Sequence, residues 1–170
     1  MAESRQIRLT VNGVPHEGLV EPRVTLADFL RGELGLVGTH VGCEHGVCGA
    51  CTVLLNGETV RACLMLAVQA DGAQLMTVEG LDEDGTLHPI QEAFLEEHGL
   101  QCGFCTPGFL LTVYELLADS PEPSDDEIMD ALGGQICRCT GYQPILAAVR
   151  LAAAKLQGNR ATGAAQRAQA

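Results

Sequence analysis

The sequence has no tryptophan, few basic residues and no long apolar run. Of its 170 residues, 10 are lysine or arginine and 22 are aspartate or glutamate, so the formal net charge is −12. Such a chain repels the phosphates of nucleic acids and anionic membrane surfaces, and we expect neither as a partner. Its apolar runs fall well short of the roughly 20 residues that cross a bilayer, which argues against a membrane span. The hydrophobic share of 46% nevertheless suits a globular protein.

We expect no secretory leader at the beginning of this sequence. Residues 1–5 are followed by alternating apolar and polar residues and not by the apolar core of a signal peptide. We therefore expect a cytoplasmic protein, in a compartment where thiols stay reduced and disulfides are rare. The eight cysteines are then expected to bind metal instead of pairing with one another.

Four of the cysteines follow the spacing C-x4-C-x2-C, with the fourth further along the chain. They are Cys43, Cys48, Cys51 and Cys63. This is the ligand pattern of a plant-type [2Fe–2S] cluster, which is held by four thiolates. Glycines lie before and between the first three cysteines, and residues without a Cβ let the backbone approach a cluster and aim N–H groups at its sulfurs. The sequence predicts one [2Fe–2S] cluster at this set.

The residues around this loop indicate a small α+β domain. Alternating apolar residues on either side of Asn-Gly turns predict β-hairpins at 5–20 and 52–60, and a further strand is expected at 74–78. Pro15 weakens the second strand of the first hairpin and suggests that it lies at a sheet edge. The order of the strands does not follow from the pattern. We predict a domain over residues 1–80.

Beyond a polar, acidic stretch at residues 79–87 the apolar period changes from two to about 3.6. The change marks a domain boundary, and residues 81–157 are predicted to form a helical domain. Residues 158–170 lack large apolar side chains and are predicted to be a disordered tail. Prolines in first helical turns and a Ser-x-x-Glu capping box mark the helix starts. The four predicted helices begin near Pro89, Pro107, Ser124 and Pro144.

The remaining cysteines form a second set in the helical region: Cys102, Cys105, Cys137 and Cys139. Each pair precedes a predicted helix, so two helix N-termini would point toward one metal site and favour anionic thiolates there. By spacing alone the set fits either an iron–sulfur cluster or a tetrahedral structural zinc. The neighbouring plant-type loop favours iron–sulfur. The alternative is a stand-alone ferredoxin-type carrier with a zinc-stabilised helical appendage.

Taken together, the two sets resemble the small [2Fe–2S] subunit of the molybdenum hydroxylases, the family of xanthine oxidase and aerobic carbon monoxide dehydrogenase. The resemblance implies an α+β fold, with an N-terminal plant-type ferredoxin-like β-grasp domain followed by an all-α four-helix-bundle [2Fe–2S] domain. It covers about residues 5–155 and includes all eight cysteines in order. The matching residues are 42–53, 61–63, 101–108 and 137–142.

The resemblance further implies a role and partners. The chain would be the electron-transfer subunit of a heterotrimeric oxidoreductase, alone or as a dimer of heterotrimers, with no catalytic residue of its own. A large subunit would hold the molybdopterin cofactor and a medium subunit would hold FAD. Electrons would pass through both clusters, and the cluster of the helical domain would lie nearer molybdenum. By matching position, Gln101 would contact the pterin and Cys139 would lie close to it.

Overall fold

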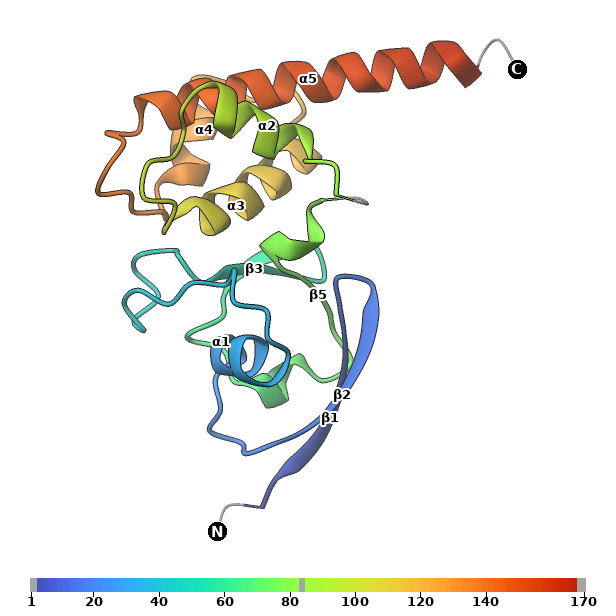
Figure 1. Ribbon diagram of the computed structural model, residues 1–170, viewed down its shortest axis with the longest axis vertical. Coiled ribbons are helices and arrows are strands. Elements are labelled where there is room, and N and C mark those ends of the chain that lie inside the picture. Colours follow the sequence, from blue (N-terminus) through green and yellow to red (C-terminus); the bar gives the residue numbers. More distant parts are fainter. Residues whose placement is uncertain (1–2, 83–84, 168–170) are drawn as a thin grey trace.

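A sheet-rich half and a helical half of the chain lie one above the other, as Figure 1 shows. The computed structural model describes residues 3–82 and 85–167. The first half supplies a five-stranded sheet with one helix against it, and the second supplies four helices. Within the described ranges, no helix is both long and apolar enough to cross a bilayer.

Two β-hairpins form at the predicted places. The first joins β1 (Arg5–Val11) to β2 (Val14–Val20), and the second joins β3 (Thr52–Leu55) to β4 (Glu58–Arg61). Both turns are Asn-Gly pairs in which the two residues have positive φ, between 51° and 95°. Asparagine and glycine tolerate this left-handed conformation, and the resulting turn matches the twist of antiparallel strands.

The strand order is β2-β1-β5-β3-β4, and β5 (Gln74–Met76) joins the two hairpins into one mixed sheet. β5 runs parallel to β1 and antiparallel to β3. The strand that contains Pro15 therefore lies at an edge, as predicted, since proline has no N–H to donate to a further neighbour. Helix α1 (Leu26–Asp28) continues into the π-helical turn η1 (Phe29–Glu33) and packs on the sheet.

The core of the sheet-rich half lies between α1–η1 and the strands. The inward residues of β1 alternate with exposed ones, as a half-buried strand requires, and they meet the buried apolar residues of the helix. The Thr25 hydroxyl accepts a hydrogen bond of 3.1 Å from the Asp28 N–H and caps α1. The largest of the buried side chains are Ile7, Val11, Leu26, Phe29 and Leu30.

The four helices of the second half begin within one residue of their predicted starts. Ser124 caps α4, and its hydroxyl and the Glu127 carboxylate exchange hydrogen bonds with each other's N–H groups, which is the predicted capping box. The most apolar helix is α3, which is covered by the other helices and by β3. The helices are α2 (Pro89–Glu96), α3 (Thr106–Asp119), α4 (Asp125–Leu132) and α5 (Gln143–Arg167).

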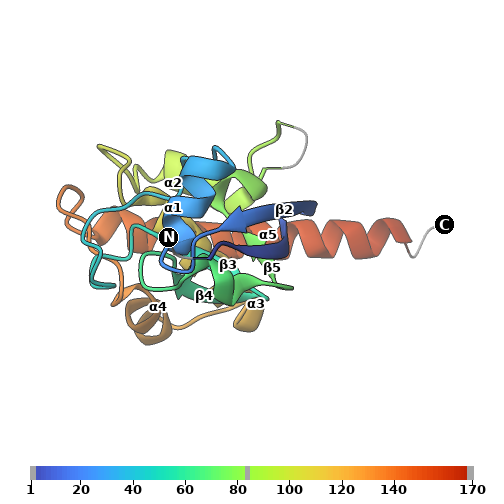
Figure 2. The ribbon, with the colours of Figure 1, turned by 90° about the horizontal axis from the view of Figure 1, so that it is seen from below.

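The structure differs from the sequence prediction at the C-terminus. The helical domain is predicted to end at residue 157, whereas α5 has helical backbone as far as Arg167. The predicted disorder of residues 158–170 stays a prediction, and residues 168–170 lie outside the described part. A helix that packing has started can continue along the chain, because each further residue adds one hydrogen bond without the cost of a new nucleus. Figures 1 and 2 show α5 running past the rest of the fold.

The two halves share part of one hydrophobic core. Leu54 of β3 is buried among the side chains of the helical core, and Met76 and Val78 pack against the same cluster. The boundary between the two domains, predicted at residues 80 and 81, stays a prediction. The shared packing means that the cysteine loops of the two halves are held at a fixed relative position.

Candidate metal centres

The first cysteine set lies around a loop and one end of the second hairpin. Cys43 and Cys48 belong to the loop between η1 and β3, Cys51 directly precedes β3, and Cys63 follows β4. Hairpin pairing therefore brings Cys51 and Cys63 together, and the Ala62 N–H donates a 3.2 Å hydrogen bond to the carbonyl of Cys51. The fourth, distant cysteine of the motif reaches the loop because the two strands are paired.

Backbone amides of the loop point at Cys43. The N–H groups of Cys48 and His45 each lie 3.4 Å from its Sγ atom. Glu44 and Gly46 have positive φ, which turns the chain so that these amides face inward. These hydrogen bonds, that of Cys48 first, lower the pKa of Cys43 to about 6. The loop therefore stabilises a thiolate, which is the form that binds iron.

Cys51, one of the two buried cysteines of the first set, is a weaker acid than an ordinary thiol. Burial, and then the nearby Cys63 thiol, raise the pKa of Cys51 to about 11. A buried thiol of this kind becomes a thiolate when a metal ion binds, because the ion compensates the negative charge. The Cys51 thiol would therefore become a thiolate when a cluster binds.

In the second set, Cys102 and Cys139 form an outer pair. Their Sγ atoms lie 3.6 Å apart, far longer than the roughly 2.0 Å of a disulfide bond. Two thiolates bound at about 2.3 Å to one tetrahedral metal would be about 3.8 Å apart. Both residues are exposed. The sulfur–sulfur distance fits two ligands of a single metal ion at the surface.

Cys105 and Cys137 form the inner pair of the same set. Burial, and then its contact with the Cys137 thiol, raise the pKa of Cys105 to about 12. Burial also acts to raise the pKa of Cys137, but hydrogen bonds from the hydroxyl and the N–H of Thr140 outweigh it, and the pKa is lowered. Cys105 occupies the N-cap position of α3, where the helix N-terminus favours negative charge.

The eight thiols are thus grouped two by two. A [2Fe–2S] cluster bound by four cysteines takes two thiolates on each iron, so each set offers the two pairs that one cluster needs. Across the described residues, no three histidine, cysteine, aspartate or glutamate side chains converge on one point. The pairs are Cys43 with Cys48, Cys51 with Cys63, Cys102 with Cys139, and Cys105 with Cys137.

Direct contacts join the two cysteine sets. The N–H of Ile136, the residue before Cys137, donates a 2.9 Å hydrogen bond to the carbonyl oxygen of Cys48. The ring of His40 stacks on Phe104 with centroids 4.9 Å apart, and its Nδ1 lies 2.7 Å from the Phe104 carbonyl oxygen. Sequence reasoning missed these residues, because no local pattern marks a side chain whose partner is about 60 to 90 positions away.

The predicted pterin contact, Gln101, lies next to Cys102 and is exposed. The structure therefore leaves its side chain accessible beside the outer pair of the second set. This placement neither requires nor excludes the role that the resemblance implies for it, and that role stays a prediction.

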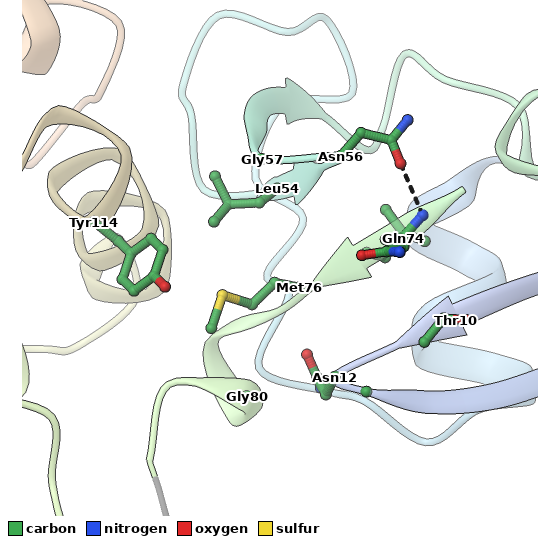
Figure 3. A pocket seen from close by; sticks show the side chains of 11 residues that line it. Thr10, Asn12, Leu54, Asn56, Gly57, Gln74, Met76, Gly80 and Tyr114 are labelled. Atoms are coloured by element: carbon green, nitrogen blue, oxygen red, sulfur yellow. Dashed lines mark hydrogen bonds between the residues drawn. The ribbon is translucent and has the colours of Figure 1, made fainter. Parts of the chain in front are cut away.

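A cavity of about 320 Å³ lies away from both sets, between the turn ends of the hairpins and α3 (Figure 3). Two asparagine side chains in its wall are hydrogen-bonded to neighbouring segments. Asn56 Oδ1 accepts a 2.9 Å hydrogen bond from the Gln74 N–H. The side-chain amide of Asn12 donates to the Thr77 hydroxyl and accepts from the Thr77 N–H. Tyr114 of α3 closes one side. The cavity contains no cysteine and belongs to the packing of the two halves.

Comparisons with known proteins agree with this geometry. Residues 9–77 match the model of a 2Fe-2S iron-sulfur cluster binding domain. Residues 77–150 match a second model, described as a [2Fe-2S] binding domain. The fold and the sites thus define a protein with two [2Fe–2S]-binding domains.

Individual relatives identify the family. The chain is 59% identical to the caffeine dehydrogenase subunit gamma of Pseudomonas sp. (strain CBB1), over 86% of this chain and 90% of the relative. Quinoline 2-oxidoreductase from Pseudomonas putida 86 contains a chain of similar structure, with a TM-score of 0.87, 48% identity and coverage of 92% and 98%. The chain belongs to the small iron–sulfur subunits of the molybdenum hydroxylases, and it is a subunit of an oxidoreductase.

A third relative has the same structure inside a longer polypeptide. Aldehyde oxidoreductase from Desulfovibrio gigas matches with a TM-score of 0.86 and 44% identity. The match covers 91% of this chain but 17% of that one. In that enzyme the two [2Fe–2S]-type domains are therefore one segment of a larger chain.

Proposed function

We propose that the chain relays electrons, one at a time, from a molybdopterin cofactor on a large subunit to FAD on a medium subunit. Cys102, Cys105, Cys137 and Cys139 would hold the first [2Fe–2S] cluster to receive them. Cys43, Cys48, Cys51 and Cys63 would hold the second. The observation that carries the proposal is the grouping of the eight thiols into four pairs, two pairs in each of two cysteine sets that are in contact with each other.

The contact between the loops supports transfer from one set to the other. The hydrogen bond from Ile136 to Cys48 joins a residue adjacent to one ligand directly to another ligand. The stacked rings of His40 and Phe104 hold the first cysteine loop to a second loop of the helical half, the one that contains Cys102 and Cys105. Rigid contacts of this kind keep two redox centres at a constant separation, which a relay requires.

Exposed apolar groups beside each cysteine set support docking of partner proteins there. Val47 and Leu64 are exposed apolar side chains beside the first set, and Phe104 and Ile136 are exposed beside the second. Exposed apolar side chains that cluster on a soluble chain favour contact with another protein surface. We propose that the second set, with Gln101 and Cys139, faces the molybdopterin subunit and that the first faces the flavin subunit.

The proposed complex is a heterotrimer or a dimer of heterotrimers and acts in the cytoplasm. Its substrate is proposed to be an N-heterocycle, because the caffeine and quinoline enzymes named above act, by their names, on such rings. Recognition of the substrate would belong to the large subunit. Assays of the purified complex against purines, quinolines and aldehydes test this class, and activity confined to aldehydes would contradict it.

The experiment for the relay uses the complete complex with its substrate. Mixing without oxygen and freezing at intervals, followed by electron paramagnetic resonance, should show both reduced clusters forming at least as fast as turnover. Replacing Gln101 by alanine should leave both clusters in place and slow their reduction by substrate, but not by dithionite. Gln74→Ala, at an exposed glutamine of β5, is the control. Clusters that stay oxidised during turnover would contradict the proposed function.

A further inference from the structure

One cysteine sulfur receives a hydrogen bond from a side-chain hydroxyl. The Thr140 Oγ1 atom lies 3.1 Å from Cys137 Sγ, and the Thr140 N–H lies 3.4 Å from the same sulfur. At Cys43, by contrast, the two donors are backbone N–H groups. A backbone donor is independent of the side chain, whereas the bond from Thr140 depends on the residue type at that position.

The surroundings of the Thr140 hydroxyl fix the direction in which its proton points. The N–H of Tyr142 donates to Thr140 Oγ1 at 3.2 Å and occupies a lone pair of that oxygen. The hydroxyl proton is therefore available to the Cys137 sulfur on its other side. A hydroxyl that accepts one hydrogen bond also polarises its own proton and strengthens the bond that it donates.

Tyr142 holds this arrangement in place. Its hydroxyl accepts a 2.9 Å hydrogen bond from the N–H of Cys137, and its ring meets Phe109 of α3 edge-on at 6.3 Å. Gly141 and Tyr142 have positive φ, which folds the chain back on itself after Thr140. Cys137 is only 8% exposed, so little water competes for its sulfur. Three hydrogen bonds thus close a ring through Cys137, Thr140 and Tyr142.

Such a hydrogen bond changes the energy of the reduced and oxidised states by different amounts. Reduction adds one electron to a cluster and increases the negative charge on its sulfurs, and a donor stabilises the more negative state more strongly. The hydroxyl keeps its proton throughout, so the step is the transfer of one electron. The reduction potential of the cluster rises, because the reduced form gains more.

We propose that Thr140 is a positioning residue whose hydroxyl raises the reduction potential of the cluster held by Cys102, Cys105, Cys137 and Cys139. The inference rests on the proposed function, because it requires a [2Fe–2S] cluster at this set. A higher potential makes this cluster a better acceptor for the electron that arrives from the partner's molybdenum site. The first set has no role in the effect.

The test measures the potentials of both clusters by redox titration of the purified complex, followed by electron paramagnetic resonance. Thr140→Val removes the hydroxyl and keeps the branched shape, whereas Thr140→Ser keeps the hydroxyl. The potential of the cluster in the helical domain should fall in the valine variant and stay near the wild-type value in the serine variant. The other cluster should be unchanged in both. Thr10→Val, on β1, is the matched control and should shift neither potential.

Equal potentials in the wild type and the valine variant would overturn the inference, and so would an equal shift of both clusters. If the valine variant loses iron, Thr140→Ala removes the hydroxyl without the second methyl group, and its potential decides the question in the same way. A wild-type complex without iron at the second set would contradict the proposed function itself. If iron is present at that set but the reduction potential is the same with and without the Thr140 hydroxyl, only the role of Thr140 is contradicted.

Discussion

The side-chain amide of Gln135 donates a 2.9 Å hydrogen bond to the hydroxyl of Thr52. Gln135 precedes Cys137 by two residues and Thr52 follows Cys51, so this bond joins the ends of the two cysteine sets. The second amide proton of Gln135 goes to the hydroxyl of Thr112 on α3 at 2.7 Å. Gln135 is 2% exposed. One buried amide therefore connects three segments that are distant in the sequence.

Replacing Gln135 by leucine should destabilise the contact between the two halves. The Thr112 hydroxyl loses the donor that Gln135 supplies, which costs on the order of 1–3 kcal/mol when a buried polar group is left unpaired. The Thr52 hydroxyl keeps its hydrogen bonds to Arg61 and to the Gly49 carbonyl and loses only the one from Gln135. The midpoint of thermal unfolding should fall, and the magnetic interaction between the two reduced clusters should change because their separation is less well fixed. Gln74→Leu, at an exposed site, is the control. An unchanged midpoint would show that the amide does not hold the halves together.

Gly49 should tolerate no side chain. A Cβ atom there would overlap the Gln135 Oε1 atom and lie 2.7 Å from the carbonyl oxygen of Gly134. Gly49→Ala should therefore lose the cluster of the first set, which iron analysis and visible absorption would detect. Gly57→Ala is a matched control, because Gly57 also has positive φ but has no atom within 4 Å of its Cβ position. Retention of the full iron content by Gly49→Ala would contradict the packing described.

Single ligand replacements should remove one cluster each. Cys48→Ser should abolish the signal of the first set and unfold much of the sheet-rich half, since metal binding and folding are coupled. Cys105→Ser should abolish the other signal and leave the first. Electron paramagnetic resonance and iron content of the two variants check the assignment. Loss of the same signal in both variants would contradict it.

The capping box at α4 should stabilise the helical half in a pH-dependent way. Ser124→Ala removes an N-cap and should cost about 0.5–2 kcal/mol. Hydrogen bonds from the Ser124 N–H first, and then from its hydroxyl, lower the pKa of Glu127. The contribution of that carboxylate is thus present above its ordinary pKa and is lost as the pH falls through the lowered value.

Ser124→Ala keeps the N–H that lowers the pKa of Glu127 most and removes only the effect of the hydroxyl. The difference in stability between the wild type and Ser124→Ala should therefore be constant above about pH 5 and shrink in part in more acidic solution. Denaturant unfolding followed by circular dichroism at several pH values measures it. A difference that grows on acidification would contradict the assignment of Glu127.

The sequence predicted the local features of the fold because they depend on neighbouring residues. The Asn-Gly turns, the Ser124 cap and the Pro89 helix start are where they were expected. The edge position of the strand containing Pro15 was also correct. Each of these features needs only a few adjacent residues and a preference of backbone geometry.

Long-range relations were not predictable in the same way. The parallel pairing of β5 with β1 joins residues more than 60 positions apart, and no pattern in either strand specifies it. Gln135 looks like an ordinary polar residue in a loop, and its partner Thr52 lies 83 positions earlier. The end of α5 is not predictable from a local pattern either: the helical domain is predicted to end at residue 157, but the backbone stays helical to Arg167, because extending a helix that packing has started costs little.

The pairing of the eight cysteines into two [2Fe–2S] sites is tested most directly by counting spins and metals in the purified complex. Full anaerobic reduction should give two distinguishable [2Fe–2S] signals of about equal intensity, and metal analysis should give about four iron ions for each copy of this chain. A single signal with about two iron ions and one zinc ion for each copy would contradict the account.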